Sequence, residues 1–156
     1  MEIREVRPID VEAVTDLMRD FAAYEKLSDY FEATPENLAA VMFGERAFVN
    51  GLVAEDNGEV IAYALFYPNY ATFRGQRGMY LEDIYISPSH QSRGIGEAMI
   101  RRIARVAKEQ GCERIDFQVL EWNQPAIGFY QKLGANRDET ERHFKFTDAA
   151  FEGLAK

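Results

Sequence analysis

The chain has 156 residues, of which 47% are apolar, 13% aromatic and 28% charged, a composition typical of an ordinary globular protein. This length predicts one domain, residues 1–156, around a single hydrophobic core. The 26 acidic and 18 basic residues give a net charge of −8, which argues against binding to nucleic acid or to an anionic membrane surface.

Several other classes are excluded by local features. The polar N-terminus, residues 1–5, has no apolar core of the kind found in secretory signals, and no apolar run is long enough to span a membrane. The single cysteine, Cys112, excludes an internal disulfide and a cysteine-rich zinc site, and is expected to be a small buried thiol. His90 and His143 share no metal-ligand spacing with each other or with nearby acids, so no metal is expected. A reducing cytoplasm is the expected location.

The first half of the chain predicts a strand, two helices and a hairpin. The strand is expected at 3–7 and the first helix runs from an Asp10 N-cap to about Tyr24, followed by a loop at 26–33. Thr34-Pro35-Glu36 combines a capping hydroxyl, a proline and an acid, and predicts a second helix that ends near Gly44. The β-rich runs 48–55 and 60–67 flank an Asn-Gly pair, which predicts a tight hairpin.

The second half predicts a loop at 69–78, a strand at 80–86 and a long amphipathic helix from about Ile95 to Gly111. Residues 113–119 alternate between apolar and polar side chains and predict a strand. Asn123 is expected to cap a short helix at 125–133, and a strand pair is expected around 142–146. This order predicts a mixed sheet, antiparallel early in the chain, with a crossover helix later.

A basic turn with two glycines, Gln91-Ser92-Arg93-Gly94-Ile95-Gly96, opens the long helix. Exposed N–H groups and the positive end of a helix favour a bound anion such as phosphate. A P-loop is excluded because the glycine-lysine-serine/threonine ending is missing, and a dinucleotide fingerprint is excluded because Met99 stands where the third glycine is needed.

This hexamer resembles the acetyl-CoA signature of the GNAT-type N-acetyltransferases, in which Gln91 takes the first place and Gly94 and Gly96 the fourth and sixth. Residues 122–135 are similar to the second signature of that superfamily: an asparagine, then a helix that ends in Phe-Tyr, then Gly-Ala. The resemblance implies an α/β (α+β) GNAT fold, with a mixed central sheet of about six to seven strands that is splayed in the middle and flanked by about four helices.

Within the superfamily, the chain resembles most the spermidine/spermine (diamine) and thialysine acetyltransferase branch. The likeness rests on residues 81–83, 121–125 and 129–130, and on Tyr24-Glu25 after the first helix. The chain departs from that branch near 138–142 and in the loop 70–78, both of which border the acceptor site in the family. The resemblance implies a homodimer, to which the aromatic-rich stretch 144–151 could contribute.

The resemblance also implies how acetyl-CoA binds, as a co-substrate and without a metal. Backbone amides of the turn would hold the diphosphate, and pantetheine would add like a short strand between the splayed strands that carry Ile84 and Phe117. Asn123 could touch the cofactor or act only as a helix cap. The positions that match the cofactor-binding region are Ile84, Tyr85, Ile86, Gln91, Ser92, Arg93, Gly94, Ile95, Gly96, Glu97, Asn123, Gln124, Pro125 and Ala126.

Acetyl transfer to an amine needs a route for the ammonium proton and a donor for the leaving thiolate. By resemblance Glu82 would anchor the cationic acceptor and take its proton, directly or through water, and Tyr130 would protonate the thiolate. Glu82 and Asp83 should point to opposite faces of the strand unless a bulge intervenes. The alternatives are solvated acids on an edge strand and, for Tyr130, a core aromatic.

The implied activity is transfer of acetyl from acetyl-CoA to a primary amine of a small cationic acceptor, a polyamine or a lysine- or thialysine-like molecule, within a ternary complex. Alternatives are a different acceptor (an amino acid, an aminated metabolite or a protein N-terminus) and a non-enzymatic CoA-binding protein. The positions that match the family's acceptor pocket are Tyr24, Glu25, Glu82, Asp116, Phe117, Gln118 and Glu139.

Overall fold

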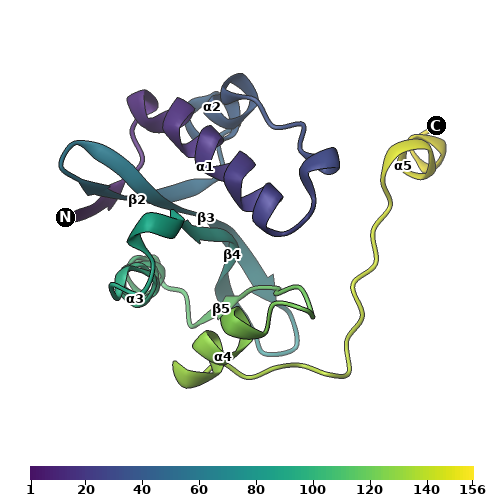
Figure 1. Ribbon diagram of the computed structural model, residues 1–156. Helices are drawn as coiled ribbons and strands as arrows, with labels where there is room; N and C mark the ends of the chain where they lie inside the picture. The colour runs from purple at the N-terminus through teal and green to yellow at the C-terminus, as the bar shows by residue number, and fades with distance from the viewer. The chain divides into compact units, whose positions relative to one another are not determined.

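A five-stranded sheet in the order β1-β2-β3-β4-β5 forms the centre of residues 1–118 in the computed structural model (Figure 1). The strands are β1 (Glu2–Glu5), β2 (Asn50–Asp56), β3 (Glu59–Ala71), β4 (Gln76–Ile86) and β5 (Arg114–Asp116). Neighbours from β1 to β4 are antiparallel, and β5 joins β4 in parallel through a crossover helix, as predicted. The sheet has five strands, fewer than the six to seven expected.

The structure describes all residues from Met1 to Lys156, in two compact units, Met1–Gln118 and Val119–Lys156. A single domain over 1–156 therefore stays a prediction. The first unit contains α1 (Val11–Tyr24), α2 (Pro35–Phe43) and α3 (Ile95–Glu109), and the second contains α4 (Gln124–Lys132) and α5 (Asp148–Leu154). None of these helices combines the length and the apolar character needed to cross a membrane.

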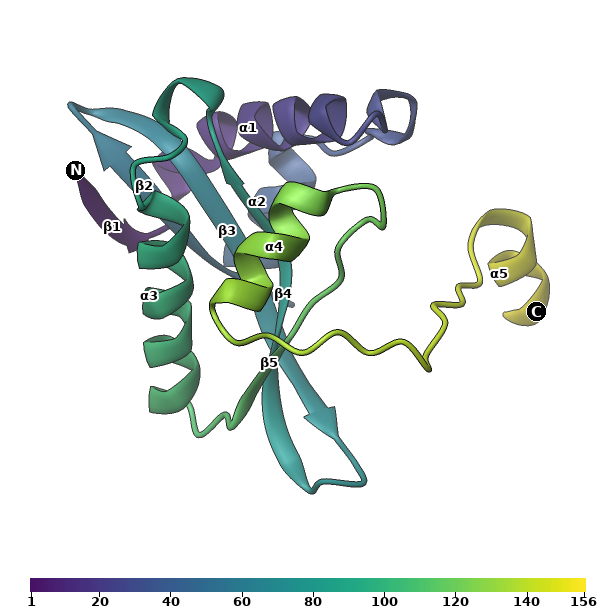
Figure 2. The same ribbon diagram turned by 60° about the horizontal axis from the view of Figure 1, so that its bottom comes forward.

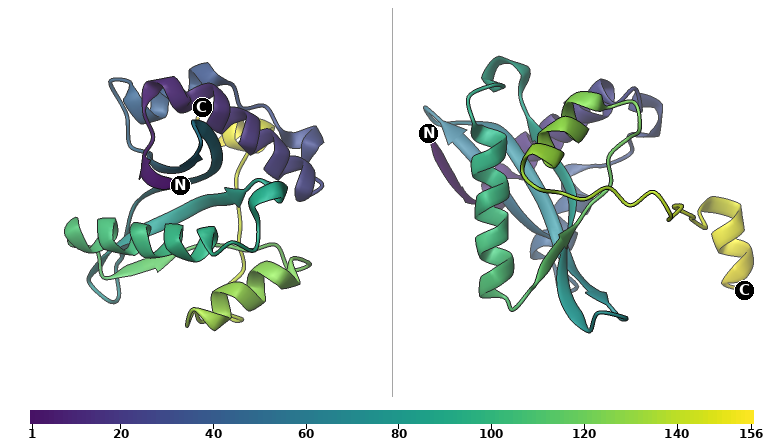
Figure 3. Two further views of the ribbon diagram at one scale, coloured as in Figure 1. Left: turned by 60° about the vertical axis from the view of Figure 1, so that its left-hand side comes forward. Right: turned by 90° about the horizontal axis from the view of Figure 1, so that it is seen from below.

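The first unit has three layers, with α1 and α2 on one face of the sheet and α3 on the other (Figures 2 and 3). The α1–α2 face buries Val14, Val53 and Tyr63 in one core cluster, and the α3 face buries Leu52, Phe66, Met99 and others in a second. Cys112 is buried in this second cluster, as predicted. Neighbouring residues of one strand therefore pack in different clusters, because successive side chains point to opposite faces of the sheet and helices cover both faces.

Local turn and cap signals are largely confirmed. Asn57 and Gly58 both have positive φ, of 52° and 83°, so the predicted Asn-Gly hairpin joins β2 to β3. Thr34 caps α2 by accepting from the Asn37 backbone N–H at 3.2 Å, and Asn123 caps α4 by accepting from the Ala126 N–H at 3.4 Å.

Asp10 does not cap α1 with its side chain, contrary to the prediction. Its carboxylate instead accepts from the Arg7 backbone N–H at 2.7 Å and from both terminal nitrogens of Arg4, at 2.7 and 2.9 Å. The Arg4 guanidinium holds the pKa of the buried Asp10 carboxyl at about 2. A charged guanidinium that donates to both oxygens is a stronger partner for the Asp10 carboxylate than a helix N–H, which explains the difference.

Three sequence predictions of secondary structure are wrong. Residues 69–78 are not a loop: β3 and β4 continue as a long second hairpin, closed by Gly75 with φ of 61°. The strand expected at 113–119 covers only Arg114–Asp116 because its pairing with β4 ends there. No strand pair forms around 142–146, since the second unit contains no strand to pair with, and α5 follows instead.

Candidate active site

A β-bulge in β4 sets the orientation of two adjacent carboxylates. Leu65 of β3 pairs with Asp83, whereas Phe66 pairs with Leu81, so Glu82 is the extra residue on β4. A bulge interrupts the alternation of side chains between the faces of the sheet. Glu82 and Asp83 therefore both face the α1–α2 side, where they line the same cavity. Of the two arrangements that the sequence allowed, the bulged one occurs.

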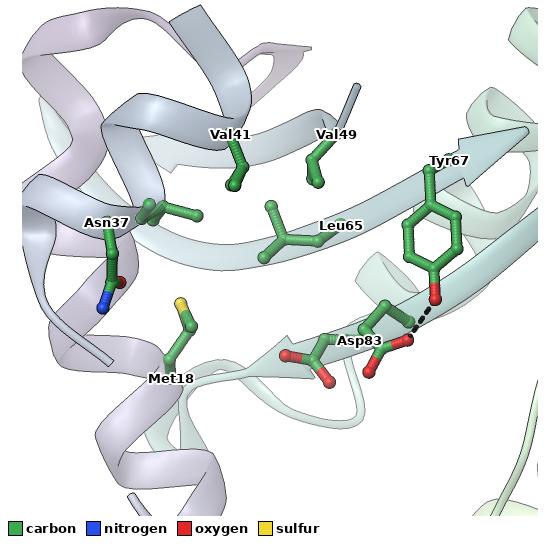
Figure 4. A pocket seen from close by; sticks show the side chains of 9 residues that line it. Met18, Asn37, Val41, Val49, Leu65, Tyr67 and Asp83 are labelled. Carbon is green, nitrogen blue, oxygen red and sulfur yellow. Dashed lines mark hydrogen bonds between the residues drawn. The ribbon is translucent and has the colours of Figure 1, made fainter. Parts of the chain in front are cut away.

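The cavity has a volume of about 330 Å³ and lies between α1, α2 and the strands β3 and β4 (Figure 4). Most of its wall is apolar, and the carboxylates lie toward one end. Its lining residues are Met18, Asn37, Leu38, Val41, Val49, Leu65, Tyr67, Glu82 and Asp83.

Two tyrosine hydroxyls hold the two carboxylates in place. Tyr67 donates to Glu82 Oε2 at 2.8 Å, as the dashed line in Figure 4 shows, and Tyr63 donates to Asp83 Oδ2 at 3.0 Å. The Tyr67 ring is itself stacked on Tyr80, with ring centroids 5.4 Å apart. Because burial and the adjacent carboxylates raise the pKa of both Tyr63 and Tyr67, the two phenols stay protonated at neutral pH and remain donors.

Asp83 is the more perturbed carboxyl of the pair. Burial raises its pKa from 3.8 to about 6, the Tyr63 hydrogen bond lowers it, and the nearby Glu82 charge raises it. Burial and the charge of Asp83 also raise the pKa of Glu25, at the end of α1. This part of the first unit therefore favours a cation, which would relieve the repulsion among Glu25, Glu82 and Asp83.

The edge of β4 next to β5 is open beyond the bulge. Pairing with β5 runs only from Gly78 to Tyr80, while β4 itself continues to Ile86. Successive residues of a strand direct their N–H and C=O groups to opposite edges, so the stretch from Ile84 to Ile86 presents backbone groups at an edge without a partner strand. This is the splay expected for the sheet, and its exposed edge has the form that an extended, amide-containing ligand can complete.

The glycine turn leads from β4 into α3 in a strained, open form. Ser92 and Gly94 have positive φ, of 62° and 75°, and no side chain caps the helix. The first N–H groups of a helix have no partner within it, so the amides that follow Gly94 are available. A Cβ added at Gly94 would meet no atom within 4 Å, so the turn is open on that side.

Side chains around the turn leave that space open. The Gln91 side chain donates to the Ile86 carbonyl at 3.1 Å and ties the turn to the end of β4. The Arg101 guanidinium, one turn further along α3, donates to Glu97 Oε1 at 2.7 Å. The Arg93 guanidinium lies 3.8 Å from Asp56 and is more than half exposed. Free amides, a positive helix end and a nearby arginine fit a diphosphate group.

The positions expected to bind ligands in the second unit lie just before α4, on it and after it. Gln124 donates from its side chain to the Glu121 carbonyl at 2.9 Å, and Pro125 takes a first-turn position of the helix. The Tyr130 ring is half-buried and packs edge-to-face on Phe129 at 5.2 Å. Glu139 lies 3.6 Å from Arg137 of the same unit.

The remaining positions that match the acceptor pocket are on the first unit. Asp116 is bound by the Arg114 guanidinium at 2.7 and 2.9 Å and accepts from Asn69 at 3.3 Å. Tyr24 ends α1 and is almost half exposed, and Phe117 and Gln118 follow directly after β5. Of this whole set only Glu82 lines the cavity.

The comparisons with known proteins agree on the family to which the chain is similar. Residues 11–135 match the acetyltransferase (GNAT) family. A thialysine N-epsilon-acetyltransferase of Bos taurus is 41% identical over 165 residues, which cover 98% of this chain and 96% of that protein. A spermidine/spermine N(1)-acetyltransferase-like protein 1 of Homo sapiens is 30% identical over 86% of this chain and 20% of its own length. An integron cassette protein from the mobile metagenome of V. cholerae has the same fold, with a TM-score of 0.81, 24% identity and coverage of 99% and 97%.

The chain therefore belongs to the acetyltransferase (GNAT) family and is an N-acetyltransferase, with relatives in the branch that the sequence predicted. Sequence reasoning gave no role to Asp83, Asn37, Tyr63 or Tyr67, which the structure places in or beside the cavity. The one signal for Asp83 was its position next to Glu82 in an otherwise apolar strand.

Proposed function

We propose that the protein transfers an acetyl group from acetyl-CoA to a primary amine of a small cationic acceptor, a polyamine or a lysine-like molecule, by direct attack within a ternary complex. The observation that carries this proposal is the pair Glu82 and Asp83 on one wall of a largely apolar cavity. Two carboxylates suit an ammonium group, and the apolar walls suit the methylene chain that bears it.

The same carboxylates offer a route for the proton that the amine must lose. An alkylammonium has a pKa near that of lysine, about 10.4, and an adjacent carboxylate raises it further. We assign binding and proton acceptance to Glu82, with Asp83 as the second acceptor. With a pKa of about 6, Asp83 is closer to the value that suits a general base near neutral pH than an ordinary aspartate. Either carboxylate can pass the proton on to water.

The donor side of the reaction uses the turn and the open edge of β4. Acetyl-CoA supplies the activated acetyl group, and membership of the family supports its use. In this proposal the amides from Ser92 to Glu97 and the Arg93 guanidinium bind the diphosphate, and the backbone from Ile84 to Ile86 binds the pantetheine arm. The Ile84 N–H is assigned to the thioester oxygen, where negative charge develops. Residues Asn123–Ala126 add contacts, and the Tyr130 hydroxyl donates a proton to the leaving thiolate.

Replacing Gly94 with alanine tests the turn. Left-handed backbone, φ of 75°, costs an alanine about 1 kcal/mol or more, so the substitution favours a different backbone conformation at the start of the helix and would move the amides that follow. We expect the affinity for acetyl-CoA to fall about tenfold or more, with a small decrease in Tm, as measured by calorimetric titration and thermal unfolding. Gly58→Ala, at another open positive-φ glycine, should lower Tm similarly and leave the affinity unchanged. Equal affinities in both variants would rule out the turn as the diphosphate site.

The acceptor class is tested by a panel of amines with release of the CoA thiol as the readout. Polyamines, diamines, lysine-like amino acids, aminated sugars and N-terminal peptides separate the proposed acceptors from the alternatives. Intersecting lines in double-reciprocal plots are expected for a ternary complex. Parallel lines together with acetylated Cys112 would overturn direct transfer, and turnover confined to peptides or sugars would overturn the acceptor class.

Location and assembly are part of the same proposal. We infer a cytoplasmic homodimer that acts on a small molecule, supported by the single cysteine and by the branch to which the relatives belong. Gel filtration at two protein concentrations tests the dimer, and a monomer at both concentrations would contradict it.

A further inference from the structure

Tyr63 is a buried phenol to which the proposed reaction gives no role. It lies on β3, in the core cluster between the sheet and the helices α1 and α2, and none of its surface is exposed. A buried tyrosine usually has a hydrogen-bond partner for its hydroxyl. Here that partner is a carboxylate, because the Tyr63 hydroxyl donates to Asp83 Oδ2 at 3.0 Å. Tyr63 therefore links the hydrophobic core to the acidic end of the cavity.

The register of β3 and β4 makes this contact. Tyr63 pairs with Tyr85 and Leu65 pairs with Asp83, so the Tyr63 hydroxyl reaches Asp83 diagonally across the two strands. The bulge at Glu82 turns Asp83 to the same face of the sheet as Tyr63. Since the hydrogen bond occupies Oδ2, Oδ1 is the oxygen that Asp83 presents to a ligand in the cavity.

Tyr63 is also the one group near Asp83 that favours the charged form of that carboxyl. The other ionisable groups around Asp83 are Glu82 on the same strand, Glu25 at the end of α1 and Tyr67 on β3, and none of them is a cation. The side chains of α2 in the cavity wall are amide or apolar. Burial and the Glu82 charge both raise the pKa of Asp83, and the Tyr63 hydrogen bond lowers it. A carboxylate in an apolar wall needs such a donor to stay ionised.

We propose that Tyr63 is a positioning residue of the acceptor site, whose hydroxyl aims the Asp83 carboxylate into the cavity and keeps it ionised for the ammonium group of the acceptor. This inference rests on the proposed function, in which Asp83 is the second proton acceptor. It adds a residue that touches neither substrate nor cofactor and acts through Asp83 alone.

Replacing Tyr63 with phenylalanine removes the hydroxyl and keeps the ring in the core. With the one favourable contact gone, the pKa of Asp83 rises above its value of about 6 in the wild type. Loss of a hydrogen bond to a charged group corresponds to roughly one pH unit in the titration of Asp83. The ionised fraction of Asp83 then falls about fivefold at pH 6, and it hardly changes at pH 8.5, where Asp83 is ionised in both proteins.

The test is the pH dependence of kcat/KM for L-lysine or spermidine, whichever the wild type acetylates faster, with acetyl-CoA at saturation. Taking the ratio of Tyr63→Phe to wild type cancels the titration of the amine itself. We expect this ratio to be about one fifth at pH 6 and close to one at pH 8.5, mostly through KM. A ratio that is equally low at both pH values, or that is one at both, would overturn the proposal.

Two further variants separate the link to Asp83 from other effects. Tyr30→Phe makes the same chemical change at an 81% exposed position outside the cavity wall, and should give a ratio of one at both pH values. In the Asp83→Asn background, Tyr63→Phe should leave the pH profile unchanged, because the group through which it acts is missing. A further shift in that background would show that Tyr63 acts through another residue, contrary to the proposal.

Thermal unfolding tests the same link without turnover. An ionised Asp83 that has lost its donor destabilises the folded protein, so Tyr63→Phe should lower Tm more at pH 8 than at pH 5. An equal loss of Tm at both pH values would mean that Tyr63 only packs in the core, and the proposal would be wrong. If the wild type acetylates neither amine, the proposed function fails, whereas the Tm comparison still decides whether Tyr63 keeps Asp83 ionised.

Discussion

Replacing Tyr130 with phenylalanine is expected to lower kcat by two to four orders of magnitude while the affinity for acetyl-CoA changes little. The substitution removes one hydroxyl, and the ring can keep its edge-to-face contact with Phe129. Without the phenol, the thiolate must leave unprotonated or take its proton from water. A phenol with a pKa near 10 and a thiol near 8.5 are close enough for such a transfer once the site favours it. The measurement is kcat at saturating amine, with the Kd of acetyl-CoA by titration.

The matched control for this prediction is Tyr30→Phe. Tyr30 lies in the turn Ser28–Tyr30 after α1, is 81% exposed and does not line the cavity, so the same chemical change is made on an open surface. Its kcat should equal that of the wild type. A Tyr130→Phe enzyme with unchanged kcat would show that the proton comes from elsewhere and would leave Tyr130 as a packing residue of α4.

The parts of the structure that follow from short-range chemistry were predictable from the sequence. An Asn-Gly pair, a Thr-Pro-Glu start and an asparagine before α4 each fix their turn or cap through atoms within four residues. The glycine turn before α3 belongs to this group as well, since its conformation is required locally by Gly94. The glycine turn and the asparagine before α4 also carried the resemblance to the family, so the fold and the donor site were predicted together.

The acceptor side depends on pairing between distant segments and could not be predicted in the same way. The bulge at Glu82 is a register shift against Leu65 and Phe66, seventeen and sixteen residues earlier by sequence number, and no local signal specifies it. Without the bulge the Asp83 side chain would face the α3 side of the sheet. A prediction that assumes strict alternation of side chains along β4 therefore cannot place Asp83 beside Glu82 in the cavity. Asn37 lies in the second helix that the sequence predicts, but its place in the cavity wall depends on where α2 packs. The strand expected at 142–146 has an alternating pattern, but a pattern cannot supply the partner strand.

Asp83→Asn is expected to affect activity and stability in opposite directions. Removing one member of a partly buried ammonium–carboxylate pair costs about 2 kcal/mol or more, so kcat/KM for the amine should fall roughly 30-fold or further. Asparagine keeps an oxygen that can accept from the Tyr63 hydroxyl, so the local structure should persist. In the wild type, amine binding should strengthen as the pH rises through about 6, the pKa of Asp83, and this step should be absent from the variant.

The sign of the stability effect follows from the same pKa. The folded-state pKa of Asp83, about 6, lies above the ordinary value of 3.8, so the folded protein favours the protonated form. The stabilisation that protonated Asp83 gives the folded protein is complete below about pH 3.8 and is lost as the pH rises through 6. The free energy of unfolding falls by up to about 3 kcal/mol over this range. Asp83→Asn should therefore have a higher Tm than the wild type at pH 8 and a similar Tm at pH 4, as thermal unfolding at both pH values will show. The exposed Asp29→Asn is the control and should not change this difference. A lower Tm for Asp83→Asn at pH 8 would mean that the ionised carboxylate stabilises the folded protein. It would contradict the inference that the negative charge beside Glu82, which serves the cationic acceptor, lowers the stability of the enzyme.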